Sequence, residues 1–139
     1  VEDSQPVKNK FTLPKLKSKR LITKTVCRHA SLIANEIKAS AVCTLTHSGY
    51  TGWQISSWRP NCLVLVFTSN KRILSQLNLL WGVKCIYYNK FQSTDKTVED
   101  VNALAIKNRY VRKGDVVVNL ASMPIKDKGQ VNTLRITKL

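Results

Sequence analysis

The chain has 139 residues, of which 43% are hydrophobic and 22% are charged, and this composition excludes a wholly disordered protein. Its longest unbroken apolar run, from Cys62 to Phe67, is far shorter than the roughly 20 residues of a membrane-spanning helix. Lys and Arg number 23 against 8 Asp and Glu, and the net charge of +15 favours anionic partners such as nucleic acid, phosphorylated metabolites or an anionic membrane face.

The N-terminal stretch differs in composition from the rest. Residues 1–18 hold two prolines and several lysines with little apolar periodicity, so we predict a linker or extended arm there, and a folded domain over residues 19–139. The sequence starts at Val1 with neither a charged n-region nor an apolar h-region. We therefore expect no signal peptide, and a piece of a longer protein.

Periodicity predicts a helix, a strand and a second helix in the first part of the domain. Apolar residues recur at spacings of three and four over residues 18–39, which is typical of an amphipathic helix. Residues 41–46 are β-prone, and the segment from Ser48-Gly49 to Trp58 is compatible with a helix that Pro60 stops. The stripe predicted to face inward in the first helix is Ile22, Val26, Ala30, Ile33 and Ile37.

Strands then alternate with helices. Continuous apolar runs predict strands buried on both faces, Asn70 is a helix cap, and Gly82 is a natural helix stop. The last strand alternates polar and apolar residues, which indicates one wet face and a place at the sheet edge. The predicted strands are residues 62–67, 83–88, 116–120 and 133–137; the inward helix residues are Ile73, Leu74, Leu77, Leu80 and Trp81, and then Val98, Val101, Leu104 and Ala105.

The predicted order of elements is helix, β, α, β, α, β, α, β, β. Strands joined through helices indicate right-handed crossovers, and hence a mostly parallel sheet with helices on both faces. The loop between the last two strands is too short for a parallel crossover, so the last strand should run antiparallel. The fold class is therefore α/β with a mixed five-stranded sheet.

Two loops at the carboxyl ends of strands are candidate ligand sites, because ligands of open α/β sheets bind there. The first packs three serine and threonine hydroxyls and a glycine into six residues, which suits a phosphate cradle, although such residues between a strand and a helix more often cap the helix. The second places two cations in the first turn of a helix. A third candidate is the loop before the last strand. The candidate residues are Thr46, His47, Ser48, Gly49, Tyr50 and Thr51, then Lys71 and Arg72, then Lys126, Lys128 and Gly129.

The sequence carries no catalytic or metal-binding constellation. Its four cysteines and two histidines form no Cys-x-x-Cys pair or metal-ligand spacing, so we expect reduced thiols in a cytoplasmic protein and no metal. There is no carboxylate pair and no nucleophile with an oriented base. From residues alone this is a binding domain.

At this point the residues resemble a known family. The segment from Ala41 to Thr51 is similar to the opening of the C-terminal domain of pyruvate kinase, where a strand ends in Thr-x-Ser-Gly-x-Ser/Thr. The similarity spans about residues 21 to 139 and continues in order through Ile55-Ser56-x-x-Arg59-Pro60, Phe67-Thr68-x-Asn70, Leu79-x-Trp81-Gly82-Val83, Lys113-Gly114-Asp115-Val116-Val117-Val118, Met123-Pro124, Gly129 and Asn132-Thr133-Leu134-Arg135-Ile136.

The resemblance implies a three-layer α/β/α sandwich that acts as a regulatory and assembly domain. In the family, phosphoryl transfer from phosphoenolpyruvate to ADP takes place in a separate barrel domain with Mg²⁺ and K⁺, so we expect this chain alone to be inactive. The resemblance also implies a homo-oligomer contact and a phosphorylated effector held by the loop of residues 46–51.

The effector and the function remain open at this stage. His47 stands where relatives that respond to fructose bisphosphate often have lysine, and no tryptophan lies around residues 98–109 for a second phosphate. A sugar monophosphate, a nucleoside monophosphate, inorganic phosphate or no effector remain alternatives. The other functions considered are a basic nucleic-acid-binding α/β domain and a purely structural domain without ligand.

Overall fold

Apolar runs bounded by polar turns become the strands of one sheet, and the amphipathic segments between them become its covering helices. The computed structural model describes residues 21–80, 82–90, 94–121 and 131–139, so the predicted arm of residues 1–18 lies outside the described residues. The described elements follow the predicted order: α2 (Leu21–Glu36), β1 (Ala41–Leu45), α3 (Tyr50–Ser57), β2 (Leu63–Thr68), α4 (Lys71–Leu77), β3 (Val83–Tyr87), α5 (Thr94–Lys107), β4 (Val116–Ala121) and β5 (Thr133–Lys138).

The five strands form one mixed sheet in the order β3-β2-β1-β4-β5. β1 pairs in parallel with β2 and with β4, and β2 pairs in parallel with β3. β5 pairs antiparallel with β4 and places Ile136 opposite Val118. These pairings confirm the predicted topology, including the antiparallel last strand at a sheet edge.

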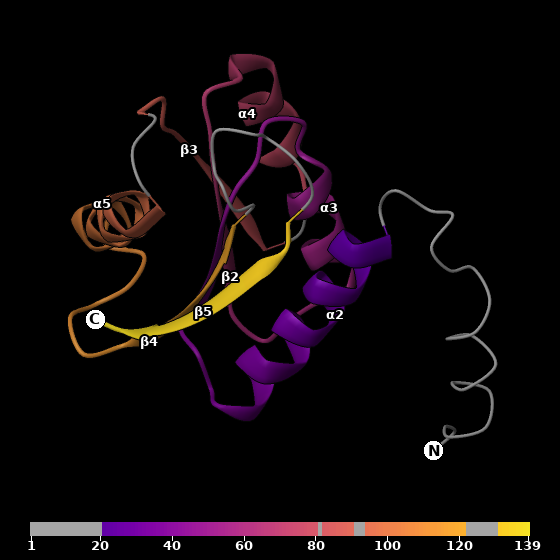
Figure 1. Cartoon of the computed structure of the whole chain (residues 1–139). Coiled ribbons are helices and arrows are strands. Elements are labelled where there is room, and N and C mark those ends of the chain that lie inside the picture. The colour runs from indigo at the N-terminus through magenta and orange to yellow at the C-terminus, as the bar shows by residue number, and fades with distance from the viewer. Residues whose placement is uncertain (1–20, 81, 91–93, 122–130) are drawn as a thin grey trace, which may run out of the picture.

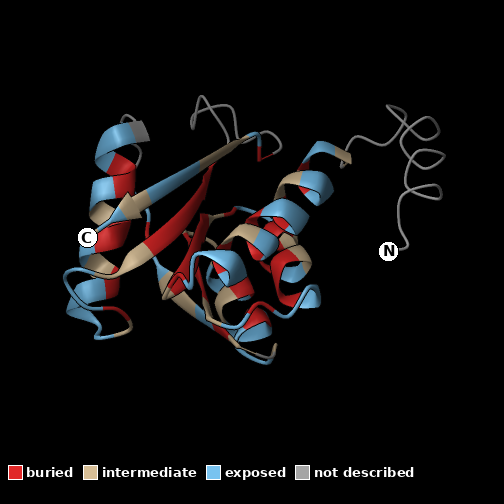
Figure 2. Ribbon diagram, turned by 90° about the horizontal axis from the view of Figure 1, so that it is seen from below, coloured by how far each residue is buried: buried red, intermediate tan, exposed pale blue. Residues whose placement is uncertain are grey.

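Helices cover both faces of the sheet, which makes three layers. Figure 1 shows α5 on one side of the strands and α2, α3 and α4 on the other. One core cluster joins α2, α3 and α4 to the sheet, and a second joins α5 to the opposite face. The inner strands β1, β2 and β4 are almost continuously buried, as the red ribbon in Figure 2 shows, whereas the edge strands β3 and β5 are mostly intermediate or exposed. The predicted α/β/α sandwich is thus confirmed.

The buried face of α2 differs from the predicted stripe. Ile22 and Ile37 were expected inside, yet they are 52% and 41% exposed. Of the predicted stripe, Ala30 is buried, and Val26 and Ile33 pack against the core cluster. The fully buried face is made of small residues, because they let the helix axis lie close to the sheet and to α3. Ile37 also lies beyond the helix, which ends at Glu36. The buried residues of α2 are Thr23, Cys27, Ala30, Ser31 and Ala34.

The helix α4 is shorter than its predicted stripe. Ile73 and Leu77 are buried as expected, but the helix ends at Leu77. Leu80 of the predicted stripe packs against the core from beyond the helix, and Trp81 lies outside the described residues. The side-chain oxygen of Asn78 accepts a hydrogen bond from the amide of Cys85, which fastens the turn to β3. The chain reverses at Gly82, whose φ of +71° lies in the left-handed region.

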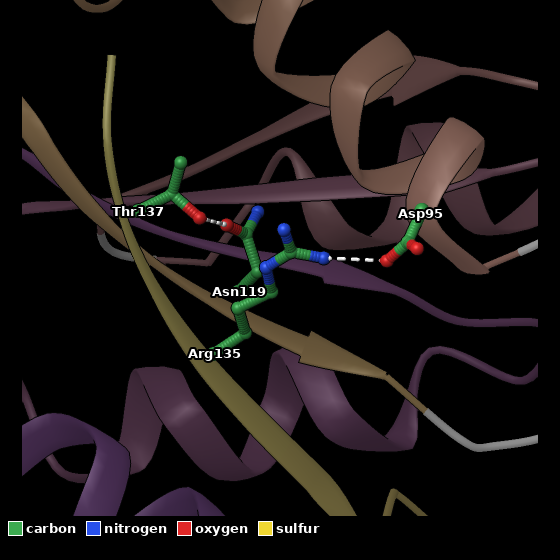
Figure 3. A network of polar contacts seen from close by, with 4 residues as sticks. All are labelled: Asp95, Asn119, Arg135 and Thr137. Atoms are coloured by element: carbon green, nitrogen blue, oxygen red, sulfur yellow. Dashed lines mark hydrogen bonds and ion pairs between the residues drawn. The ribbon is translucent and has the colours of Figure 1, made fainter.

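Polar contacts join α5, β4 and β5, and Figure 3 shows those between Asn119 and Thr137 and between Arg135 and Asp95. Asn119, at the centre of β4, is 3% exposed, and its Nδ2 donates to Asn102 Oδ1 of α5 at 3.0 Å. Its Oδ1 accepts from the Thr137 hydroxyl of β5 at 3.2 Å. At the surface, Arg135 of β5 pairs with Asp95 of α5 at 2.8 Å. The buried amide therefore ties three elements together at one point.

Candidate functional site

The loops that follow β1 and β2 lie at the same end of the sheet. Their strands are parallel neighbours, so both loops start from the same carboxyl edge. The amide of Thr46 donates to the carbonyl of Phe67 at 3.0 Å and extends the pairing to the end of β1. The structure thus brings the first two sequence-predicted loops together. The third, with Lys126, Lys128 and Gly129, lies outside the described residues.

Inside the first loop, the hydroxyl oxygens cap the start of α3. Thr46 Oγ1 accepts a hydrogen bond from the amide of Gly49 at 3.0 Å, and Ser48 Oγ accepts one from the amide of Tyr50 at 3.3 Å. The first turn of a helix leaves further amides without intrahelical acceptors, here those of Thr51 and Gly52. Thr46 and Thr51 are buried, whereas His47 and Ser48 are exposed. Ser48 therefore presents the hydroxyl most open to solvent.

Two glycines set the shape of this corner. Gly49 has a φ of +87°, and a Cβ on it would lie 3.1 Å from Ile73 Cγ2. Gly52 lies inside α3, and a Cβ there would lie 2.9 Å from Val66 Cγ2 of β2, closer than real Cβ atoms come. Gly52 was not singled out from the sequence. Its role depends on the contact between α3 and β2, which only the folded chain shows.

An open pocket of about 370 Å³ adjoins the loop. The loop contributes one wall, α4 contributes an opposite wall, and Trp53 of α3, 58% exposed, stands beside them. The site combines the exposed Ser48 hydroxyl and the start of α3 with an apolar and aromatic surface, which suits a ligand with an anionic group and a larger organic part. The lining residues are Ser48, Gly49, Tyr50, Trp53, Ile73, Gln76 and Leu77.

The second loop places its cations less centrally than the sequence indicated. Asn70 caps α4, because its Oδ1 accepts from the amide of Arg72 at 3.1 Å. Lys71 and Arg72 are both exposed. The ammonium of Lys71 lies 5.6 Å from the ring centroid of Tyr87, at the end of β3. Lys71 therefore reaches toward the β3 edge, and neither cation lines the pocket beside the first loop.

The four cysteines are free thiols held in apolar surroundings. Burial raises the pKa of the Cys27 thiol from 9.0 to about 12. Burial also raises the pKa of Cys43 to about 12, with the charge of Cys62 as a second cause. The pKa of Cys85 rises to about 11 for the same reason. At neutral pH these thiols stay protonated, so they act as small apolar residues.

The chain is expected to lose stability at alkaline pH through Cys27 and Cys43. Their folded pKa lies above the unfolded value of 9.0, so their contribution is complete below pH 9 and is lost as the pH rises toward 12. Urea unfolding at pH 8 and at pH 10.5 measures the loss of unfolding free energy. The same measurement on a Cys27→Ala/Cys43→Ala variant gives the part that comes from lysines and tyrosines, which is subtracted from the wild-type loss. An equal loss in both proteins would contradict the assignment.

The described residues add two further observations. In this part of the chain, no group of three or more His, Cys, Asp and Glu side chains is arranged to hold a metal ion. None of the described helices has the length and apolar character needed to cross a membrane.

The fold and the pocket define a class: an open α/β domain with a candidate ligand site at the carboxyl ends of its parallel strands. The sequence model for the family described as pyruvate kinase, alpha/beta domain, matches residues 24–137. The chain belongs to this family.

Individual relatives agree with this family. The chain is 33% identical to a pyruvate kinase of Sporosarcina psychrophila over 115 residues, which are 83% of this chain and 20% of that protein. It is 35% identical to a pyruvate kinase of Clostridium acetobutylicum over 103 residues, or 74% of this chain and 22% of that protein. The chain spans about a fifth of the length of these relatives.

A solved structure shows the same fold. The crystal structure of a pyruvate kinase from Cryptosporidium parvum superposes with a TM-score of 0.75 and 22% sequence identity. The superposition covers 90% of this chain and 23% of that one.

Proposed function

We propose that this chain is the C-terminal regulatory and assembly domain of a pyruvate kinase, and that its loop of residues 46–51 binds the phosphate of a phosphorylated effector. The parent enzyme would transfer a phosphoryl group from phosphoenolpyruvate to ADP in cytoplasmic glycolysis and release pyruvate and ATP. A barrel domain of the same polypeptide would perform this transfer with Mg²⁺ and K⁺. The isolated chain is then inactive, and its contribution is regulation and assembly.

The position of the first loop carries the effector proposal. It starts α3, where backbone amides and the positive end of the helix dipole favour an anion. The Ser48 hydroxyl is exposed beside the pocket, and its oxygen already accepts from Tyr50, so its hydrogen can be donated outward. The chain's net charge of +15 adds a general attraction for anions. Together these features support a site for one phosphate with an organic part resting near Trp53.

Calorimetric titration tests the proposal with inorganic phosphate, a sugar monophosphate and a nucleoside monophosphate. We expect saturable binding of at least one of these ligands at physiological salt. Ser48→Ala should weaken it about tenfold, since a hydrogen bond to a charged group is lost. Ser57→Ala is the matched control. Ser57 is an exposed serine at the other end of α3, and its hydroxyl donates to the Gln54 carbonyl within the helix. Equal affinity in wild type, Ser48→Ala and Ser48→Ala/Gly49→Val would exclude the loop.

We also propose that β5 takes part in self-association. In the described sheet, β5 pairs with β4 alone and forms one edge. Ile136 on this strand is 51% exposed, and an unpaired strand edge favours pairing with a copy of itself. Sedimentation at micromolar concentration should show a dimer that Ile136→Lys dissociates. A monomer in the wild type would count against a stable contact by this domain alone.

A further inference from the structure

The side chain of Asn70 connects the two loops of the candidate site. Its Nδ2 donates to the carbonyl of His47 at 3.4 Å, across from the second loop to the first. Its Oδ1 is already used by the amide of Arg72 at the start of α4. The backbone N–H of Arg72 can bond only to the side-chain oxygen of Asn70. The oxygen therefore faces Arg72, and the Nδ2 group faces His47.

The backbone of Asn70 is itself fixed by a hydrogen bond to the end of β2. The Thr68 hydroxyl oxygen, at the end of β2, accepts from the amide of Asn70 at 3.1 Å, and Thr68 is 0% exposed. The rigid end of β2 therefore sets the backbone of Asn70, and its side chain then reaches the first loop. On the other side of the corner, Gly49 faces Ile73 of α4, and a Cβ on Gly49 would lie only 3.1 Å from Ile73 Cγ2.

We infer that Asn70 is a positioning residue for the anion site, an inference that rests on the proposed function. It touches no phosphate in this scheme. It holds the carbonyl of His47, and with it the Ser48 hydroxyl and the amides that follow Gly49, in one fixed arrangement. A preorganised loop spends no binding free energy on ordering itself when the anion arrives.

Asn70→Ser separates this role from helix capping. Serine is a good N-cap and keeps an acceptor for the Arg72 amide, but it is too short to reach His47. We expect the melting temperature to stay within a few degrees of wild type, while phosphate affinity falls about fivefold or more and the loop amides of Gly49 and Tyr50 exchange hydrogen faster. Asn70→Ala, which lacks both contacts, should lose affinity and thermal stability together.

Asn108→Ser is the matched control. Asn108 follows the last residue of α5, on the other face of the sheet, and its side-chain amide also donates to a backbone carbonyl, that of Leu104. This variant should change neither the affinity nor the exchange at Gly49. If Asn70→Ser leaves both quantities as in wild type, Asn70 is not a positioning residue, whatever the loop binds. If the wild type binds no inorganic phosphate or phosphorylated metabolite while Asn70→Ser still speeds exchange at Gly49, the link between the loops is supported and the proposed function fails.

Discussion

Replacing Gly52 with valine is expected to destabilise the chain by about 2–3 kcal/mol, as overpacking of a tight contact does. Even the first added carbon would lie 2.9 Å from Val66 Cγ2, on a strand whose neighbouring core residues are almost fully buried. The helix α3 must then move off β2, and the loop before it moves as well. Phosphate affinity should therefore fall together with the free energy of unfolding. Urea denaturation and calorimetry on the same samples measure both.

The control for this experiment lies in the same helix. Ser57→Val introduces the same β-branched residue at an exposed position of α3, so it should lower the free energy of unfolding by about 1 kcal/mol or less, through loss of the hydroxyl bond to the Gln54 carbonyl, since serine and valine have similar helix propensities. A second variant tests the contact itself: Gly52→Ala with Val66→Ala removes the methyl group that the new Cβ would meet. It should be less destabilised than the sum of its parts. Strict additivity, or a stable Gly52→Val protein, would contradict the close packing.

Asn119→Leu should have an effect of similar size, about 2–4 kcal/mol. Leucine keeps the volume but leaves the Asn102 side chain, 6% exposed, without the partner that it has in β4, and an unsatisfied buried polar group costs about 1–3 kcal/mol. The hydroxyl of Thr137 loses its acceptor as well. Thermal and urea unfolding measure the change.

The neighbouring ion pair provides the contrast. Arg135→Ala removes a bond of 2.8 Å between side chains that are 49% and 83% exposed, and such surface pairs contribute about 0–1 kcal/mol. Asn119→Leu/Asn102→Leu should recover part of the loss, since both partners become apolar. A larger effect from Arg135→Ala than from Asn119→Leu would show that the buried amide does not hold the layer together.

The order and type of every described element could be predicted from the sequence. The spacing of apolar residues and the cap, glycine and proline residues that bound each element are local signals. The run before Thr68, the cap at Asn70 and the alternation after Thr133 each needed only neighbouring residues. The antiparallel last strand followed from the length of one loop. These features are set by backbone geometry and by how much apolar surface a segment carries.

The errors and omissions have a different physical origin. The predicted face of α2 centred on larger apolar residues, but close approach to the sheet selected Cys27 and Ala34 beside the correctly predicted Ala30. The close fit of Gly52 on Val66 and the reach of Asn70 to His47 join segments distant in sequence, so no local pattern contains them. The candidate loop was found because a glycine among hydroxyls after a strand is a recognisable local feature. Whether Lys71 would face the pocket or Tyr87 was decided by tertiary packing.

Amide chemical shifts during a titration with inorganic phosphate, at physiological salt, test the central claim most directly. We predict saturable shifts concentrated at Ser48, Gly49, Tyr50, Thr51 and Gly52, at the start of α3, and their loss in Ser48→Ala. Shifts spread over the lysine-bearing surface without saturation, or none at these five amides for phosphate or any phosphorylated metabolite, would contradict a phosphate site in this loop.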